Sequence, residues 1–330
     1  MNKIYKWGII GPGRIAQKFA QALERVPDAC LHAVASRDIE KAKQFAAIYN
    51  APVFYDSYGA LASDPEIDAV YIATPHTFHY AHVLLCLQQK KAVLCEKPMS
   101  VDYASTLEMV TAARQNNCFL MEAMWSRFLP IIEKTIQLIN EGEIGTLKYL
   151  RADFGFAAPF DPASRLYNLQ LGGGSLLDVG VYPLFLALLL MGKPDAIKSF
   201  AHLSKTGADE TTNAILFYKN GRMANILSSI VAQTPLSAEI TGTEGTIILD
   251  RPWYKGRELQ VRKNDSITQT ISLPYGDNGF EFQVQELQQC LAKNKTESDL
   301  LPLDFSLLMS SVTDEILKTA NIVYKLQSSS

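Results

Sequence analysis

The architecture of this chain follows from a short segment near its amino terminus, which reads Ile4-Tyr5-Lys6-Trp7-Gly8-Ile9-Ile10-Gly11-Pro12-Gly13-Arg14-Ile15-Ala16. Residues 4–10 are mostly apolar and rich in strand-forming side chains, so they predict a buried strand. The turn that follows has the form G-x-G-x-x-A and leads into residues 16–25, whose apolar side chains have helical spacing. Such a turn lets the backbone approach a pyrophosphate, while the first helical amides face its charge. We therefore predict dinucleotide binding here, rather than a purely structural turn.

The same alternation of elements continues to about residue 123. Further strands are expected at residues 31–36, 53–55, 69–73, 92–95 and 119–122, and further helices at 40–49, 77–89 and 104–116. Strands that alternate with helices of this length need crossover connections, and crossover connections produce a parallel sheet. We therefore predict an α/β fold with a doubly wound Rossmann domain over residues 1–123.

A different pattern follows over residues 124–330. Helices are expected at 131–140, from about Leu184, at 279–293 and at 303–325, and a strand is expected at 147–156. Between residues 196 and 273, short strands alternate with turn signals such as Asn220-Gly221 and Gly242-Thr243-Glu244-Gly245. These features predict a substrate-binding α+β domain with a large, mostly antiparallel open sheet that is covered by helices on one face.

Composition and charge are those of an ordinary globular protein. Of the 330 residues, 48% are hydrophobic and 20% are charged, which excludes a disordered or coiled-coil chain. The net charge of −3 is too nearly neutral for a protein that binds nucleic acid. The five cysteines are scattered without a C-x-x-C pair, so we expect reduced, buried thiols and neither a zinc site nor a disulfide framework.

Two observations bear on where the protein acts. The amino terminus runs directly into the first strand, so no signal peptide is expected. The longest apolar run, residues 179–191, contains Pro183 and is shorter than the ~20 residues that span a membrane. We therefore expect a cytoplasmic protein without membrane contact.

The end of the second strand, Ala35-Ser36-Arg37, bears on which cofactor binds. NAD sites usually carry an acidic residue here for the ribose 2′-hydroxyl, whereas a hydroxyl followed by a guanidinium suits a 2′-phosphate. Ser36 and Arg37 therefore favour NADP. NAD stays open as the alternative, because Asp38 could be the ribose ligand displaced by one or two residues. In the structural interpretation, Ser36 or Asp38 caps the next helix and Arg37 is a solvated charge.

Polar residues follow two neighbouring strands of the predicted sheet. Thr74-Pro75-His76 ends one strand, and Glu96-Lys97-Pro98 ends the next. Ligands of open α/β sheets bind at this carboxyl edge, so the two turns should flank one cleft. In the second half, Gly172-Gly173-Gly174 precedes Asp178 and Tyr182, which are four residues apart and would share one face of a helix.

Together these segments resemble the Gfo/Idh/MocA oxidoreductase family. The resemblance covers both halves of the chain in order and rests on Gly11–Ala16, Ala73-Thr74-Pro75, Glu96-Lys97-Pro98 and residues 172–182. The Asp-x-x-x-Tyr form is similar to the branch that holds dimeric dihydrodiol dehydrogenases, NADP-dependent D-xylose dehydrogenases and glucose–fructose oxidoreductase. Many sugar and inositol dehydrogenases have His in place of Tyr182. Residues 124–128 also resemble that branch, whereas His76 departs from the Asn that commonly follows Thr-Pro in relatives.

The resemblance implies an NAD(P)-dependent oxidoreductase that transfers hydride between the nicotinamide and a CH–OH carbon of a sugar, polyol or trans-dihydrodiol. It implies that Lys97 and Tyr182 form an acid–base pair beside the nicotinamide, with Asp178 near the substrate, and that a cis peptide precedes Pro98. It also implies a homodimer or homotetramer that assembles through the C-terminal sheet. The residues expected to bind the cofactor are Gly11, Gly13, Arg14, Ile15, Ser36, Arg37, Thr74, His76, Glu96 and Lys97.

Simple electrostatics makes an acid–base pair of Lys97 and Tyr182 chemically reasonable. A free phenol has a pKa of ~10, so it is almost wholly protonated at neutral pH. An ammonium ~4 Å away favours the phenolate by up to ~4 kcal/mol at an effective dielectric constant of ~20, which brings its ionisation near working pH. The phenol then accepts the hydroxyl proton during oxidation and returns it during reduction.

These residues also have structural interpretations. Lys97 could form an ion pair with Glu96 or Asp178, and Tyr182 could end a core helix with its hydroxyl at the rim. The candidate pocket residues, for which packing is an equal explanation, are Trp125, Arg127 and Arg165.

The spacing of His76, His79 and His82 invites a metal interpretation. The residues between them include no Cys, Asp or Glu to serve as a fourth ligand, so capping or packing roles at the start of a helix are favoured over zinc. We therefore expect no metal.

The function has one alternative from a different class. A regulator that senses the redox state of NADP without turnover would use the same cofactor site. Such a protein has no need for both Lys97 and Tyr182, so their joint presence favours an enzyme.

Overall fold

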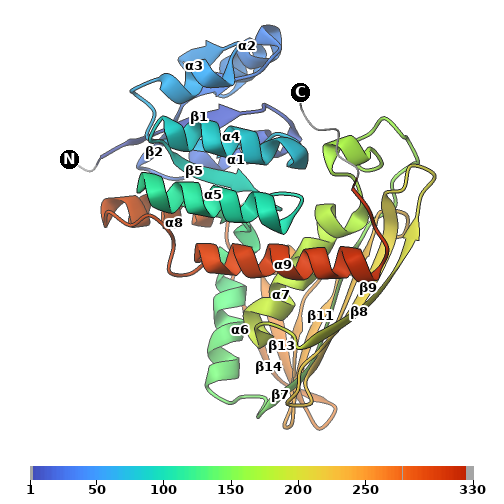
Figure 1. The fold of residues 1–330 in the computed structure, drawn as a ribbon. Helices are drawn as coiled ribbons and strands as arrows, with labels where there is room; N and C mark the ends of the chain where they lie inside the picture. Colours follow the sequence, from blue (N-terminus) through green and yellow to red (C-terminus); the bar gives the residue numbers. More distant parts are fainter. Residues whose placement is uncertain (1–2, 277, 325–330) are drawn as a thin grey trace. The chain divides into compact units, whose positions relative to one another are not determined.

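The computed structural model describes residues 3–276 and 278–324, which form two compact units. The first unit contains residues 3–125 and 278–307, and the second contains residues 126–276 and 308–324. Residues 278–307, which the sequence analysis assigned to the C-terminal domain, thus pack with the dinucleotide-binding part of the chain. Figure 1 labels many of the helices and strands of both units.

A six-stranded parallel sheet forms the centre of the first unit. Its strands are β1 (Tyr5–Ile10), β2 (Ala29–Ala35), β3 (Val53–Tyr55), β4 (Ala69–Ile72), β5 (Ala92–Glu96) and β6 (Leu120–Ala123). They lie in the order β3-β2-β1-β4-β5-β6, and all neighbours are parallel. Every residue of β4, β5 and β6 is buried, as expected of a sheet covered on both faces. The strand order reverses between β1 and β4, which makes this the switch point of a doubly wound sheet.

Helices connect these strands as crossovers. They are α1 (Arg14–Leu23), α2 (Ile39–Ile48), α3 (Tyr58–Ser63), α4 (His79–Gln88) and α5 (Tyr103–Asn116), with a 3-10 turn η1 (His76–Phe78) before α4. The helix α8 (Glu281–Ala292) comes much later in the chain and belongs to the same unit. In α1, the buried side chains Ala16, Phe19, Ala20 and Leu23 recur at helical spacing, and α1 packs against α8. On the other side, α4 packs against α3 and α5.

The helix α3 corrects the sequence analysis, which expected no element between residues 55 and 69. It has only six residues, too few to show a helical period, and Ser57 caps it by accepting a hydrogen bond from Ala60 N.

The second unit is built on an eight-stranded sheet. Its strands are β7 (Leu147–Gly155), β8 (Ala196–Leu203), β9 (Asp209–Phe217), β10 (Met223–Ser229), β11 (Ala238–Gly242), β12 (Thr246–Leu249), β13 (Glu258–Lys263) and β14 (Ser266–Ser272). They lie in the order β14-β13-β12-β11-β7-β10-β9-β8, and all neighbours are antiparallel except β10 and β7. The predicted turn signals fall at the β9–β10 and β11–β12 connections. The prediction of a large, mostly antiparallel sheet is therefore confirmed.

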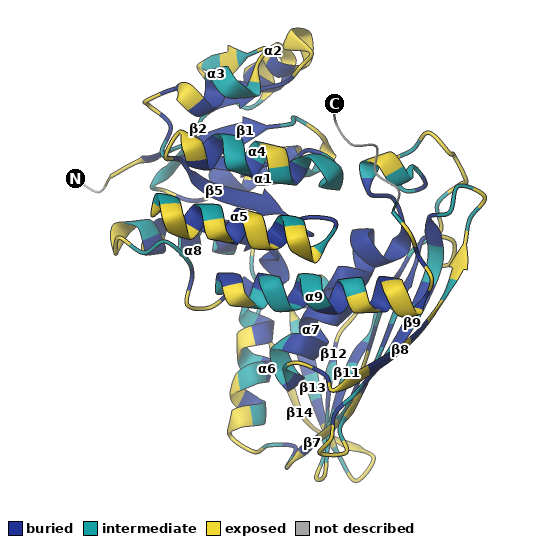
Figure 2. Ribbon diagram, viewed as in Figure 1, coloured by how far each residue is buried: buried dark blue, intermediate teal, exposed yellow. Residues whose placement is uncertain are grey.

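Burial alternates along these strands because helices cover one face of the sheet. In β8, Ile197 and Ser199 are buried, whereas Lys198 and Phe200 are exposed. The covering helices are α6 (Pro130–Asn140), α7 (Val181–Met191) and the end of α9 (Leu303–Thr319), which begins in the first unit. Figure 2 shows the contrast between buried α7 and the exposed turns at the ends of the strands.

The helix that contains Tyr182 differs from the prediction. It begins at Val181 rather than near Leu184, and a π-helical turn, η4 (Leu176–Gly180), leads into it. The sequence analysis considered residues 179–191 too short to span a membrane, but the structure joins them to a longer run, Leu169–Met191, that is long and apolar enough to cross one. Most of it is buried inside the second unit, as in the core helix of a globular domain. The predicted end of the last helix, Lys325, lies outside the described residues.

Candidate active site

The glycine turn follows β1 at the switch point of the first sheet. Gly11 has a φ of +87°, and a Cβ there would lie 2.9 Å from Thr74 Cγ2, so the backbone and the space both require glycine. Gly13 is the N-cap of α1, and a Cβ there would meet no described atom within 4 Å. No side chain of the described residues caps α1, so the amides of Arg14 and Ile15 are available to an anion. The turn therefore fits the pyrophosphate of a dinucleotide.

Of the residues that follow β2, Asp38 caps the next helix, whereas Arg37 is exposed to solvent. Asp38 Oδ1 accepts hydrogen bonds from Glu40 N (3.2 Å) and Lys41 N (3.3 Å), so this carboxylate caps α2. Ser36 is buried, and its Oγ accepts a hydrogen bond from Asp38 N at 3.2 Å. Arg37 is exposed, and its guanidinium carbon lies 5.7 Å from the centre of the Phe78 ring. The structural interpretation of Asp38 as a helix cap is confirmed.

One buried histidine joins the two predicted turns at the carboxyl edge. His79 is fully buried at the start of α4, with Nε2 2.8 Å from Thr74 O and Nδ1 2.9 Å from Pro98 O. Thr74 follows β4, and Pro98 follows β5 after a cis peptide at Lys97-Pro98, as the family resemblance implied. The Thr74 turn and the Lys97 turn follow paired strands, β4 and β5. Because His79 contacts the backbone of both turns, it holds them at a fixed distance from each other.

The other two histidines of the triplet have different surroundings. His82 Nδ1 lies 3.0 Å from Thr74 Oγ1, and burial lowers the pKa of His82 to about 4. The His76 ring centre lies 5.7 Å from that of His79. Over residues 3–276 and 278–324, no group of three or more His, Cys, Asp or Glu side chains could hold a metal ion.

Two buried carboxyl groups lie near Lys97. Glu96 Oε2 accepts a hydrogen bond from Lys97 N at 3.2 Å, and Tyr71 Oη donates to Glu96 Oε1. Glu122, at the end of β6, accepts hydrogen bonds from Met99 N (2.9 Å) and Ser306 Oγ (2.6 Å). Burial raises the pKa of both carboxyl groups, and the charge of Lys97 opposes this rise. The pair therefore holds the Lys97–Met99 turn to its strands.

Sequence reasoning missed Glu122. Its signal was the same one that identified Glu96, an acidic side chain at the carboxyl end of a buried strand.

In the second unit, Arg165 and Asp178 are brought together. Arg165 Nη1 donates to Asp178 Oδ1 at 2.7 Å, and Nη2 donates to Oδ2 at 3.3 Å, so the pair is bidentate. The Asp178 side chain is 9% exposed and that of Arg165 is 56% exposed. The carboxylate of Asp178 is therefore engaged by a cation, which suits an orienting role better than proton transfer.

Tyr182 lies in an aromatic cluster that the sequence analysis did not identify. Its ring centre is 5.3 Å from that of Phe154 in β7 and 5.5 Å from that of Tyr254. Phe154 and Tyr254 stack with their centres 4.0 Å apart. Burial raises the pKa of Tyr254. Because the three residues are far apart in the chain, no local pattern could have grouped them.

The two remaining pocket candidates belong to different units. Trp125 packs on Phe280 in the first unit, with ring centres 5.0 Å apart. Arg127 is buried in the second unit and forms an ion pair with Glu133 of α6. The ion pair with Glu133 therefore supports the structural interpretation of Arg127.

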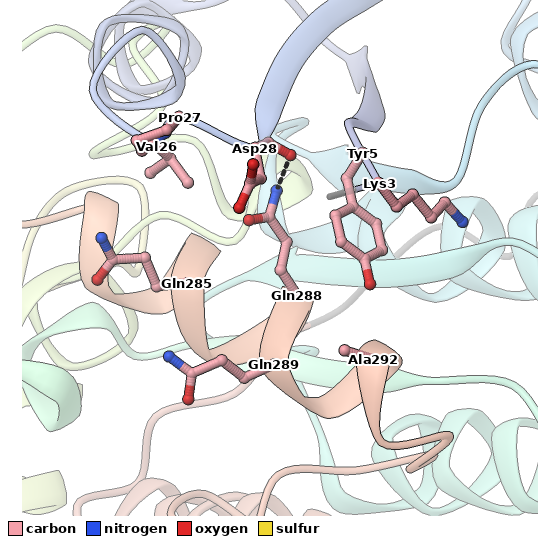
Figure 3. Close-up of a pocket in the computed structure, with 9 residues that line it drawn as sticks. All are labelled: Lys3, Tyr5, Val26, Pro27, Asp28, Gln285, Gln288, Gln289 and Ala292. Atoms are coloured by element: carbon pink, nitrogen blue, oxygen red, sulfur yellow. Dashed lines mark hydrogen bonds between the residues drawn. The ribbon is translucent and has the colours of Figure 1, made fainter. Parts of the chain in front are cut away.

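A cavity of about 540 Å³ lies at the opposite edge of the first sheet from the glycine turn (Figure 3). Gln288 of α8 reaches across it and donates a hydrogen bond to Asp28 O at 3.2 Å. The other lining residues are Lys3, Tyr5, Val26, Pro27, Gln285, Gln289 and Ala292. Because β1 begins here and the glycine turn follows its other end, this cavity is separate from the candidate active site.

Comparison with curated proteins finds relatives over nearly the whole chain. The chain is 38% identical over 329 residues to trans-1,2-dihydrobenzene-1,2-diol dehydrogenase from Xenopus laevis, with 97% of this chain and 99% of the relative covered. It is 34% identical over 328 residues to the human protein of the same name, with 97% and 98% covered.

Solved structures with a similar fold include an aldose–aldose oxidoreductase from Caulobacter crescentus in complex with glycerol. It has a TM-score of 0.88 and 25% identity, with 97% of this chain and 98% of that chain covered. A 3-ketoreductase from Actinomadura kijaniata in complex with NADP has a TM-score of 0.87 and 24% identity, with 96% and 98% covered, and shows the shared fold.

Family profiles agree with these relatives. The profile described as an oxidoreductase family with an NAD-binding Rossmann fold matches residues 5–124, and the GFO/IDH/MocA C-terminal domain matches residues 132–248. Together with the glycine turn and the parallel sheet of the first unit, these matches settle the family. The chain is a member of the Gfo/Idh/MocA family of NAD(P)-dependent oxidoreductases.

Proposed function

We propose that this protein is an NADP-dependent dehydrogenase that acts on a CH–OH carbon of a trans-dihydrodiol, with sugars and polyols as the next substrates to test. The observation that carries the proposal is the arrangement at the carboxyl edge of the first sheet. The start of α1, the Thr74 turn and the Lys97 turn follow the neighbouring strands β1, β4 and β5. A dinucleotide whose pyrophosphate meets α1 extends its nicotinamide half along this edge. This supports a role for Lys97 beside the reacting carbon.

Lys97 and Tyr182 act as the acid–base pair in this proposal. When bound, the cofactor supplies the nicotinamide carbon that accepts or donates hydride. Tyr182 removes the proton from the substrate hydroxyl, and the Lys97 ammonium stabilises the phenolate and the alkoxide character of the substrate. Asp178 and Arg165 orient the substrate rather than transfer the proton, because their charges already pair.

The preference for NADP rests on the residues after β2. Asp38, which would bind the ribose 2′-hydroxyl in an NAD site, is engaged in capping α2. The Ser36 hydroxyl and the exposed Arg37 guanidinium offer a donor and a planar cation to a 2′-phosphate. We therefore expect a lower KM for NADP than for NAD, and Arg37→Ala should raise the KM for NADP alone.

The substrate preference rests on the surroundings of Tyr182. Phe154 and Tyr254 place apolar ring surface beside it, which suits the largely hydrocarbon ring of a dihydrodiol. The relatives named as trans-1,2-dihydrobenzene-1,2-diol dehydrogenases support the same class. Sugars stay second because a structural neighbour is an aldose–aldose oxidoreductase in complex with glycerol.

Assembly and location complete the proposal. The uncovered face of the second sheet carries apolar residues, among them Phe200, which is 82% exposed. A second copy that paired with this face would bury them, so we expect a homodimer or homotetramer in solution. The free state of all five cysteines supports a reducing compartment such as the cytoplasm.

The test is an assay of the purified protein with NADP or NAD against trans-dihydrodiols, aldoses and polyols, in which the ultraviolet absorbance of the reduced nicotinamide is followed. We expect turnover with NADP and a trans-dihydrodiol. Tight binding of NADPH without turnover on any member of the panel would favour the redox-sensing regulator. A clear preference for NAD would contradict the cofactor assignment and leave the family unchanged.

A further inference from the structure

Asp209 is a buried acid that none of the sequence motifs includes. It begins β9 and is fully buried. Its Oδ2 accepts three hydrogen bonds, from Ser175 Oγ (2.7 Å), Leu176 N (2.8 Å) and Thr212 Oγ1 (2.6 Å). Its Oδ1 has no hydrogen-bond partner among the residues that the structure describes. A buried carboxylate is costly to keep in a fold unless its hydrogen bonds compensate, so this one needs an explanation.

The contacts of Asp209 converge on one point of the second unit, the start of η4. Ser175 and Leu176 are the residues at which the Gly172–Gly174 segment becomes helical. Leu176 N is one of the amides at a helix start that has no partner within the helix, so Asp209 acts as a helix cap supplied from a distant strand. Ser175 Oγ also lies 2.9 Å from Ser228 Oγ of β10, so the cap is tied to a second strand.

The turn formed by Gly172, Gly173 and Gly174 fits closely around the carboxylate of Asp209. A Cβ on Gly174 would lie 2.1 Å from Asp209 Oδ1 and 2.8 Å from Tyr324 Oη. Tyr324 Oη donates a hydrogen bond to Gly173 O at 2.8 Å. The peptide between the two glycines is thus held between a carboxylate and a phenol, and Gly174 has a φ of +134° that other residues rarely adopt. No side chain larger than hydrogen fits at residue 174 without movement of Asp209.

The segment that begins here carries Asp178 and Tyr182. Asp178 lies within η4, and Tyr182 follows in the first turn of α7. A π-helical turn changes the direction of the side chains that follow it, so the position of its first residue sets where Tyr182 points. We propose that Asp209 is a positioning residue, which holds the start of η4 so that Tyr182 and Asp178 are presented to the substrate in a fixed orientation.

This inference rests on the proposed function, because it assumes that Tyr182 takes part in turnover. The test is Asp209→Asn, which keeps the shape of the side chain and removes its charge. An amide that accepts from Leu176 N places its NH2 group at the position of Oδ1, which has no hydrogen-bond partner among the described residues. We expect kcat/KM for the substrate to fall by ~10- to ~100-fold, through a lower kcat and a higher KM, because small displacements of a reacting group have effects of this size.

Two further readouts separate positioning from a general loss of structure. The KM for NADP should stay at its wild-type value, because the glycine turn that binds the pyrophosphate belongs to the other unit. The rise of kcat/KM with pH in the oxidative direction should move to higher pH, because a displaced Tyr182 gains less from a nearby cation. The matched control is Thr212→Val, which removes one hydrogen bond to Oδ2 and leaves those to Ser175 and Leu176. It should keep nearly wild-type kinetics.

The inference is overturned if Asp209→Asn keeps the wild-type kcat/KM. It is also overturned if kcat falls in proportion to the folded fraction while the substrate KM and the pH profile stay unchanged. If Asp209→Asn does not fold, Ser175→Ala replaces it, since this variant keeps the contact to Leu176 N and should raise the substrate KM more than Thr212→Val does. Equal KM values for these two variants contradict the inference. Absence of turnover in the wild-type protein instead contradicts the proposed function.

Discussion

Each unit has a buried polar side chain that ties together segments of the candidate site, His79 in the first unit and Asp209 in the second, and the two differ in how they do so. In the first unit, His79 contacts two carbonyl oxygens, those of Thr74 and Pro98, which lie 5 and 19 positions away in the chain. In the second unit, Asp209 accepts from Ser175 Oγ and Leu176 N, which lie 34 and 33 positions away. The first anchor is thus more local than the second. Contacts between residues that are close in the chain can be recognised as a sequence motif, whereas contacts with a strand that is distant in the chain cannot.

The chemistry of the two anchors also differs. Burial lowers the pKa of His79, which favours the neutral ring with a single N–H. Only one of its two carbonyl contacts is then a hydrogen bond. Burial raises the pKa of Asp209, but the three donors around Oδ2 favour its ionised form. The carboxylate of Asp209 therefore accepts all three hydrogen bonds at once, whereas the neutral ring of His79 donates to only one of the two carbonyl oxygens at a time.

The largest effect is expected from the reacting groups that these anchors hold. Lys97→Ala and Tyr182→Phe should each lower kcat by ~10²–10⁴, the usual contribution of an acid–base group. The double variant should be little worse than either single variant, because groups that act as a unit are not additive. The measurement is steady-state kinetics with NADP and the preferred substrate. Full activity in Tyr182→Phe would remove the mechanism and leave the family assignment intact.

A smaller effect is expected at the two glycines that approach the anchored segments. Gly11→Ala places a Cβ 2.9 Å from Thr74 Cγ2 and 3.1 Å from backbone atoms of Ala73 and Thr74, in a backbone of positive φ, and should lower the free energy of unfolding by ~1–3 kcal/mol. Gly174→Ala places a Cβ 2.1 Å from the hydrogen-bonded carboxylate of Asp209, and should cost more. Urea unfolding of both variants measures the difference.

Gly13→Ala is the control for this comparison, because a Cβ there meets no described atom within 4 Å. It should leave the free energy of unfolding nearly unchanged and still raise the KM for NADP, since the added methyl group occupies the path of the pyrophosphate. If Gly174→Ala is as stable as Gly13→Ala, the close fit around Asp209 has no energetic importance, and the contrast between the two anchors fails.

The contrast also explains how much the sequence could predict. All six strands of the first sheet were predicted within a few residues, because hydrophobic runs alternate with helical periods and the G-x-G-x-x-A turn orders them. The bidentate pair of Arg165 and Asp178 and the aromatic cluster of Tyr182 depend on how distant segments pack. The contact of Tyr324 with Gly173 spans 151 positions. No periodicity reports such contacts, so Asp209, Phe154 and Tyr254 became visible only in the folded chain.

The smallest effect is expected at His79, where two substitutions separate its two contacts. The amide nitrogen of Asn occupies about the place of Nδ1, so His79→Asn can still donate to Pro98 O, next to Lys97. The amide nitrogen of Gln occupies about the place of Nε2, so His79→Gln can still donate to Thr74 O. Neutral His79 shares a single N–H between the two carbonyl oxygens, so each substitution fixes the donor on one of them. One hydrogen bond is worth ~1 kcal/mol, so changes of up to about fivefold are expected.

The two variants should therefore differ in which kinetic constant changes. His79→Asn keeps the Lys97 turn in place and should raise the KM for NADP with little loss of kcat, because Thr74 belongs to the expected cofactor site. His79→Gln keeps the Thr74 turn and should lower kcat with little change in that KM. Steady-state kinetics at saturating substrate distinguishes the two patterns. Identical patterns would mean that His79 supports the whole edge of the sheet as one body, in which case the local anchor is no more selective than ordinary core packing.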